Sequence, residues 1–114
     1  MPLNANIPRS GMLAAQRRQS VSAHNTANLN TDGVSSQRLL SQEGPGGGVH
    51  TQVDTVQLSN EALDLSQSLE GVQNNVDPTS EAVNQITARN QLTQNARTLH
   101  TQDRMLGAAL DILA

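Results

Sequence analysis

The chain has no aromatic side chain, and this limits the kind of core that it can build. Phe, Tyr and Trp fill the centre of most small domains because each buries a large area. Only 35% of the residues are hydrophobic, and many of these are alanines. Small apolar side chains let helix backbones approach closely. The composition therefore favours long paired helices in one small domain of 114 residues.

The same composition excludes several classes of function. There is no cysteine, which removes disulfides and thiolate metal sites. The net charge is -3, and Arg17-Arg18 is the only basic pair, so the sequence predicts no nucleic-acid partner. No apolar run reaches the ~18 residues of a membrane span, so we expect no direct membrane insertion. The first residues lack the basic start and apolar stretch of a cleavable secretion signal.

The last third of the chain, residues 77–114, reads as one long helix. Asp77-Pro78 is typical of a helix start, because Asp accepts free amides and proline suits the first turn. Further along, one position in every three or four forms a seam that is apolar except for one aspartate: Leu92, Ala96, Leu99, Asp103, Leu106, Leu110 and Leu113. Such a heptad seam needs a partner, because an isolated helix gains little from its own hydrogen bonds.

A shorter helix is predicted over residues 9–30. Its apolar stripe is thin and rich in alanine, with Ile7, Ala14 and Val21 spaced seven apart on one face. Asn and Asp residues then end the helix, and Gly33 suits the left-handed conformation common just past a helix end. Because the last helix is longer, an antiparallel pair would leave part of its seam uncovered.

The middle of the chain is the least helical part. The glycines of residues 44–48 indicate a flexible loop tip. The β-branched residues of 49–56 favour extended structure and could pair with residues 34–40 as a short hairpin, although disorder is the alternative. A brief helix over residues 60–70 follows and ends at Gly71.

The predicted fold is therefore mainly α. The terminal helices pair as an antiparallel hairpin or coiled coil, and a short flexible or weakly β segment joins them. We divide the chain into an N-terminal helical part (1–33), a Gly-rich central part with a possible hairpin and short helix (34–75), and a C-terminal helix (76–114). The burial available in a single chain is small, so we expect a marginally stable monomer that gains helix on assembly.

Both ends of the sequence resemble the bacterial flagellar rod and hook proteins. The N-terminal resemblance is carried by residues 10–16 and by Val21, Ala23, Asn25, Ala27, Asn28, Asn30, Thr31 and Gly33. The C-terminal resemblance is carried by Val76, Glu81, Val83, Asn84, Ile86, Ala88, Arg89, Asn95, Ala96, Leu99, Thr101, Asp103, Met105, Leu106 and Leu110. Larger members insert β-rich domains between their terminal helices, and residues 34–75 are too short for one. The chain is most similar to the small proximal rod proteins.

The resemblance implies a structural function without enzyme activity. Family members are axial subunits that pair their terminal helices around the channel of a tube. They leave the cell through the flagellar export apparatus without a cleavable signal peptide. It therefore implies a subunit of the periplasm-spanning basal-body rod, needed for motility. Its partners would be other rod or hook subunits, copies of itself and the export apparatus. An adaptor or regulator of axial protein export that is not itself incorporated is the alternative function.

The residues that we expect to pack the helices or the assembly lie on both terminal segments. They are Met12, Ala15, Val21, Asn25, Ala27, Asn28, Val83, Ile86, Leu92, Ala96, Leu99, Leu106 and Leu110. The family pattern further implies hydrogen bonds between helices for Asn25, Asn28, Asn84 and Asn95, and the alternative is that these residues are solvated on a helix surface or cap a helix end. Asp103 has two interpretations, a water-exposed residue at the edge of the seam or a polar residue that sets the register of a subunit contact.

No catalytic, cofactor or metal site is predicted. The three histidines, His24, His50 and His100, lack the short helical spacing of a metal pair. The glycine run lacks the Lys-Ser/Thr ending of a phosphate loop. Glu61, Asp64 and Glu81 are interpreted as solvated helix faces rather than as a carboxylate cluster.

Overall fold

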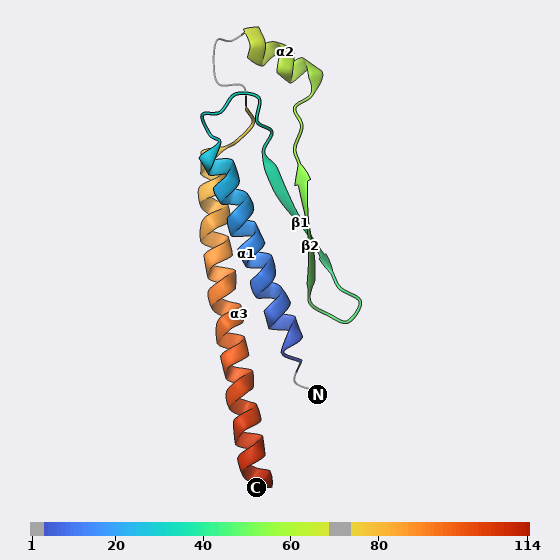
Figure 1. The fold of residues 1–114 in the computed structure, drawn as a ribbon, viewed down its shortest axis with the longest axis vertical. Helices are drawn as coiled ribbons and strands as arrows, with labels where there is room; N and C mark the ends of the chain where they lie inside the picture. Colours follow the sequence, from blue (N-terminus) through green and yellow to red (C-terminus); the bar gives the residue numbers. More distant parts are fainter. Residues whose placement is uncertain (1–3, 69–73) are drawn as a thin grey trace.

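A computed structural model describes residues 4–68 and 74–114 (Figure 1). It contains three helices and one hairpin: α1 (Asn6–Ala27), β1 (Gln37–Glu43), β2 (Val49–Thr55), α2 (Asn60–Ser68) and α3 (Pro78–Leu113). Helices α1 and α3 lie side by side and run in opposite directions, and the hairpin lies along α1 (Figure 1). The molecule measures 73 × 25 × 14 Å. The mainly helical prediction with a short central sheet is confirmed.

Helix α3 begins as the sequence predicts. Asp77 has an extended backbone, and its carboxylate accepts the amide of Thr79 at 3.0 Å and the hydroxyl of Ser80 at 2.7 Å. Pro78 occupies the first helical position, where no amide hydrogen is needed. The helix then runs through 36 residues, about 54 Å, whereas the 22 residues of α1 span about 33 Å.

Both ends of α1 differ from the prediction of residues 9–30. The helix begins at Asn6, because the side chain of Asn4 accepts the Asn6 amide and Pro8 is tolerated within the first turn. It ends at Ala27, where the amide of Asn28 bonds the carbonyls of His24 and Asn25. Gly33 has the expected left-handed backbone, with φ +75°, but it lies in the turn toward β1 rather than just past the helix.

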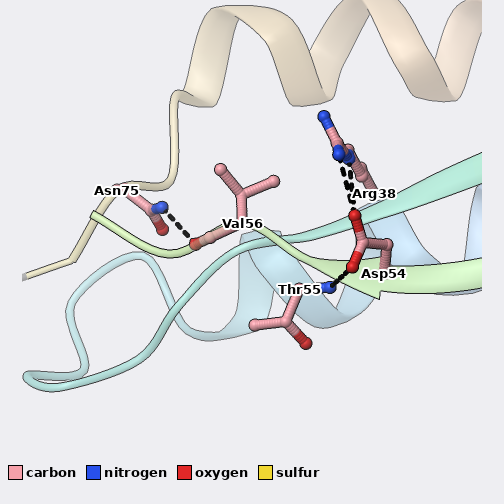
Figure 2. Close-up of polar contacts among 5 residues, drawn as sticks. All are labelled: Arg38, Asp54, Thr55, Val56 and Asn75. Atoms are coloured by element: carbon pink, nitrogen blue, oxygen red, sulfur yellow. Dashed lines mark hydrogen bonds and ion pairs between the residues drawn. The ribbon is translucent and has the colours of Figure 1, made fainter. Parts of the chain in front are cut away.

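The central segment forms the hairpin rather than the disordered alternative. Its strands pair antiparallel from Gln37 opposite Thr55 to Glu43 opposite Val49. The first strand thus begins three residues later than the predicted 34–40. The predicted end of α2 at residues 69–71 lies outside the described residues. On one face of the hairpin, Arg38 pairs with Asp54 at 2.8 Å, as Figure 2 shows.

Side chains of α1 hold the hairpin along the helix. Arg17 donates to the carbonyl and to the hydroxyl of Thr51, at 3.0 and 2.9 Å. Closer to the turn of the hairpin, the amide of Val49 donates to the hydroxyl of Ser10 at 3.1 Å. Gly48 has φ +88°, and a Cβ there would lie 2.6 Å from that hydroxyl. The glycine loop is therefore a docked turn that requires glycine at this position.

The two long helices approach each other through small residues. Pro8, Ala15 and Ser22 are buried at a spacing of seven on α1, and Glu81 and Ala88 are buried at the same spacing on α3. Besides Pro8, the buried apolar side chains among the described residues are Ala15, Val21 and Ala88, exposed by 1%, 9% and 2%. Of the predicted stripe, Val21 is buried, whereas Ile7 and Ala14 line a hollow that the hairpin and α3 share, with Val49 and Asn95.

We predict that Gly11→Val destabilises the fold by about 1–3 kcal/mol, the usual cost of overpacking. A Cβ at Gly11 would lie 2.7 Å from Nδ2 of Asn95 on α3. Adding Asn95→Ala should recover most of the loss, because it removes the clashing atoms. Thermal melting followed by circular dichroism would measure both variants at one protein concentration. A double variant no more stable than Gly11→Val would contradict this close approach.

A second prediction concerns the pH dependence of α3. The hydrogen bonds from Ser80 and Thr79 to Asp77 stabilise its carboxylate and lower its pKa below the ordinary value of 3.8. Its charge therefore stabilises the folded state above pH 3.8, and this contribution disappears as the pH falls through the lowered pKa. The melting temperature of Asp77→Asn should fall below that of the parent near neutral pH and approach it in acid. A difference in melting temperature between the parent and Asp77→Asn that is the same at every pH would argue against this role.

Candidate assembly site

One side of the helix pair carries two apolar hollows. We call them the upper groove and the lower groove, with volumes of about 490 and 450 Å³. The upper groove is lined by Ala15, Gln16, Gln19, Gln85, Ile86, Ala88, Arg89 and Leu92. The lower groove is lined by Ala5, Met12, Ala96, Leu99, His100, Gln102, Asp103 and Leu106. No hairpin residue lines either of them. The predicted heptad seam from Leu92 to Leu106 thus lies in these grooves.

The C-terminal part of α3 continues past the start of α1 (Figure 1). We call residues 105–113 the apolar overhang. Its large side chains are strongly exposed: Met105 by 48%, Leu106 by 45%, Leu110 by 66%, Ile112 by 85% and Leu113 by 83%. A surface of this kind on a short helix end is typical of a protein contact site.

The predicted packing residues fall into three groups. Ala15, Val21 and Asn25 are buried. Met12, Ile86, Leu92, Ala96, Leu99 and Leu106 line the two grooves. Ala27, Asn28, Val83 and Leu110 lie outside both grooves, and Ala27 is the last residue of α1. The role of each residue in assembly stays a prediction.

The most constrained polar contact joins three elements at the upper end of the helix pair. Asn25 is 1% exposed, and its Nδ2 donates to the carbonyl of Gln37 at 2.7 Å and to Oε1 of Glu81 at 2.8 Å. Its Oδ1 accepts the amide of Gln37 at 2.8 Å. A single amide therefore ties α1 to both β1 and α3. We call Asn25, Gln37 and Glu81 the polar junction.

Glu81 corrects the sequence interpretation of a solvated carboxylate. It is 7% exposed, and its backbone carbonyl accepts the hydroxyl of Ser22 at 3.0 Å. Oε1 accepts the amide of Asn25, whereas Oε2 has no hydrogen-bond partner within the described residues. The interpretation was wrong because burial comes from the antiparallel pairing, which places the first turn of α3 against the last turns of α1.

Two adjacent asparagines fix the chain where it enters α3. Nδ2 of Asn74 donates to the carbonyls of Asn28, Leu29 and Thr31, which follow α1. Asn75 accepts the amide of Ser36 at 2.6 Å and donates to the carbonyl of Val56 at 2.6 Å; Figure 2 shows the second bond. These amides bind backbone groups that no helix or strand uses, so the base of the hairpin stays attached to the helix pair.

The asparagines predicted to bond between helices differ in outcome. Asn25 makes such a bond, to Glu81. Asn28, the C-cap of α1, donates to the carbonyl of His24, and Asn95 donates to the carbonyl of Gln91 in its own helix, so within the described residues neither is shown to bond to another helix. Asn84 and both interpretations of Asp103 stay predictions; Asp103 is exposed and lines the lower groove.

Sequence reasoning missed the residues that close the helix pair most tightly. Ser22 and Ala88 are not among the predicted packing residues, and Asn74 and Asn75 are not among the predicted contacts. The spacing of seven that relates Pro8, Ala15 and Ser22 was visible in the sequence. It was overlooked because proline and serine do not count as apolar seam residues. No sequence signal marks Asn74, because its acceptors lie more than forty residues earlier in the chain.

Comparison with known families supports the structural function. Residues 66–112 match the family described as flagellar basal body rod FlgEFG protein C-terminal, which is less than half of the chain. This segment is similar to the flagellar rod proteins. The match supports the rod and hook family broadly, and with it a structural role in the flagellar basal body. It covers nearly all of α3, including both grooves' α3 residues and most of the overhang.

No curated protein matches the chain. None of the helices in residues 4–68 and 74–114 combines the length and apolarity that a membrane span requires.

The polar junction generates a charge test. Asn25→Asp removes the donor and places a second carboxylate beside Glu81, so we expect the free energy of unfolding to fall by more than the ~1–3 kcal/mol of one unsatisfied buried group. Adding Glu81→Gln should restore part of this loss, because the new amide can donate to the introduced carboxylate. Asn28→Ala is the matched control and should change stability by less than ~0.5 kcal/mol.

Chemical or thermal unfolding of the three variants would measure these effects. An Asn25→Asp loss that Glu81→Gln does not reduce would show that the two side chains are not coupled.

Proposed function

We propose that the chain is a structural subunit of the flagellar basal-body rod. It assembles with other axial subunits and with copies of itself through its terminal helices. The observation that carries this proposal is the coincidence of two features on α3: the segment that matches the rod family also carries the most exposed large apolar side chains of the described residues, among them Leu110 and Ile112. A helix of this kind is completed by neighbours rather than by its own chain.

The small interior supports the same conclusion. The buried apolar side chains among the described residues are two alanines, one valine and one proline, and the largest fully buried side chains are polar, Asn25 and Ser22. Burying five overhang side chains at about 1.5–3 kcal/mol each would add roughly 8–15 kcal/mol, comparable to the whole stability of a small domain. Assembly is therefore the natural source of stability for this fold.

The finer parts of the proposal follow from the resemblance of the sequence to axial proteins. The subunit leaves the cell through the flagellar export apparatus without a cleavable signal peptide and resides in the periplasm-spanning part of the rod. A low intrinsic stability suits a subunit that must be unfolded for transport. The small proximal rod proteins are the members that the chain resembles most in length.

The direct experiment is to delete the gene, assay swimming and examine purified basal bodies of the parent strain for the chain. A rod subunit should be present in basal bodies, and its loss should abolish motility with incomplete rods. Normal rods in the deletion strain, with the chain found only in the soluble fraction, would favour the alternative adaptor function.

The role of the overhang can be tested separately. We expect the double variant Leu106→Gln/Leu110→Gln to be exported but not incorporated. Two leucines at about 1.5–3 kcal/mol each correspond to more than a hundredfold loss of subunit affinity. Leu40→Gln on the hairpin, 39% exposed, is the matched control and should be incorporated normally. Equal incorporation of both variants would exclude the overhang as a subunit contact.

A further inference from the structure

Helix α2 stands apart from the other helices and strands of the described residues. Within the described residues it packs against no other helix or strand, and Figure 1 shows it beyond the upper end of the helix pair. One of its faces is nevertheless apolar. Ala62 and Leu65 lie on one face, with Leu65 62% exposed, and Glu61 and Asp64 supply two negative charges. A helix that exposes an apolar face beside charges is typical of a docking segment.

The upper groove has the complementary properties. Its lining is apolar and amide-bearing, and its one charged lining residue is Arg89. Arg89 makes no ion pair among the described residues. Its α3 side extends from Gln85 to Leu92, about 12 Å, and the nine residues of α2 span about 14 Å. Length, apolar character and sign of charge therefore all agree.

The groove that α2 can occupy is not that of its own chain. Val56 is fixed on the hairpin side of the helix pair by Ser36 and Asn75. Four extended residues lead from Val56 to Asn60, a reach of at most about 14 Å. To enter its own upper groove, α2 would have to pass around a helix about 10–12 Å wide and descend two turns. A neighbouring chain has no such restriction.

We propose that α2 docks in the upper groove of a second copy of this chain. Leu65 enters the apolar part of the groove, and Glu61 or Asp64 pairs with Arg89. This contact is separate from the overhang, so each copy would offer one donor helix and one acceptor groove. Because donor and acceptor are different surfaces, the contact is head-to-tail and can repeat along an assembly. The inference does not depend on where the chain resides in the cell.

The absence of cysteine makes a clean cross-linking experiment possible. Full-length Leu65→Cys and Gln19→Cys chains would be mixed under mild oxidation, and disulfide-linked heterodimers would be counted. A disulfide forms only when the two Cα atoms come within about 7 Å. We expect the heterodimer to form at least several times faster than with Gln42→Cys, a matched exposed glutamine on β1. A yield equal to that control would overturn the proposal.

Two further arms identify the occupant. If Ile112→Cys of the overhang links to Gln19→Cys faster than Leu65→Cys does, the groove binds the overhang and the proposal is wrong. If a single chain that carries both Leu65→Cys and Gln19→Cys forms the disulfide within itself as a monomer, α2 binds its own groove, and the proposal of a second copy is wrong. Arg89→Glu in the acceptor should slow the link by about two- to fivefold, and Glu61→Arg with Asp64→Arg in the donor should reverse that loss.

The cross-linking assay uses the purified chain and needs no flagellum. Its failure alongside detection of the chain in basal bodies would remove the α2 contact and leave the rod function intact. If the cross-link forms but the chain is absent from basal bodies, the α2 contact is supported and the rod function is wrong.

Discussion

The hydrogen bonds of Asn25 hold the structure together, because one buried amide on α1 satisfies groups of two other elements, β1 and α3. Two of its partners are the backbone amide and carbonyl of Gln37, which begin the first strand, and the third is the carboxylate of Glu81 in the first turn of α3. Buried polar groups are costly when unpaired and specific when paired. In most domains, the packing of large side chains fixes the register between helices. This chain has few bulky apolar residues, so the hydrogen bonds of Asn25 fix the register instead.

The small residues along α1 and α3 follow from the same limitation. Ala15, Ser22 and Ala88 leave room for close backbone approach, and Gly11 leaves room for the side chain of Asn95. Close contact between helices of this kind buries little apolar area. The larger side chains of α3 therefore remain on its outer face and on the overhang. The small residues that let α1 and α3 pair closely thus leave the large apolar side chains of α3 exposed. Contact with other subunits would cover them, and this connects the fold to assembly.

The hairpin covers one side of the helix pair and leaves the other side open. The hairpin is fixed at its base by Asn25 and Asn75 and near its turn by Ser10 and Arg17, so it covers one side of α1. The other side of the helix pair keeps its grooves open. Helix α2 follows the hairpin and, within residues 4–68 and 74–114, contacts no other helix or strand. One face of the molecule is thus closed by its own chain, and the other is available to other chains.

The sequence by itself determined the helical class, the start of α3 at Asp77-Pro78, the glycine turn and the antiparallel pair with an uncovered helix end. These depend on local chemistry: capping, proline geometry and heptad spacing act over a few residues. The tertiary structure decided which faces meet. It buried Glu81, placed Ile7 and Ala14 at a hollow that the hairpin and α3 share, and gave Asn74 acceptors at the end of α1. Those outcomes depend on side chains far apart in the sequence, whose contacts exist only once the helices have paired.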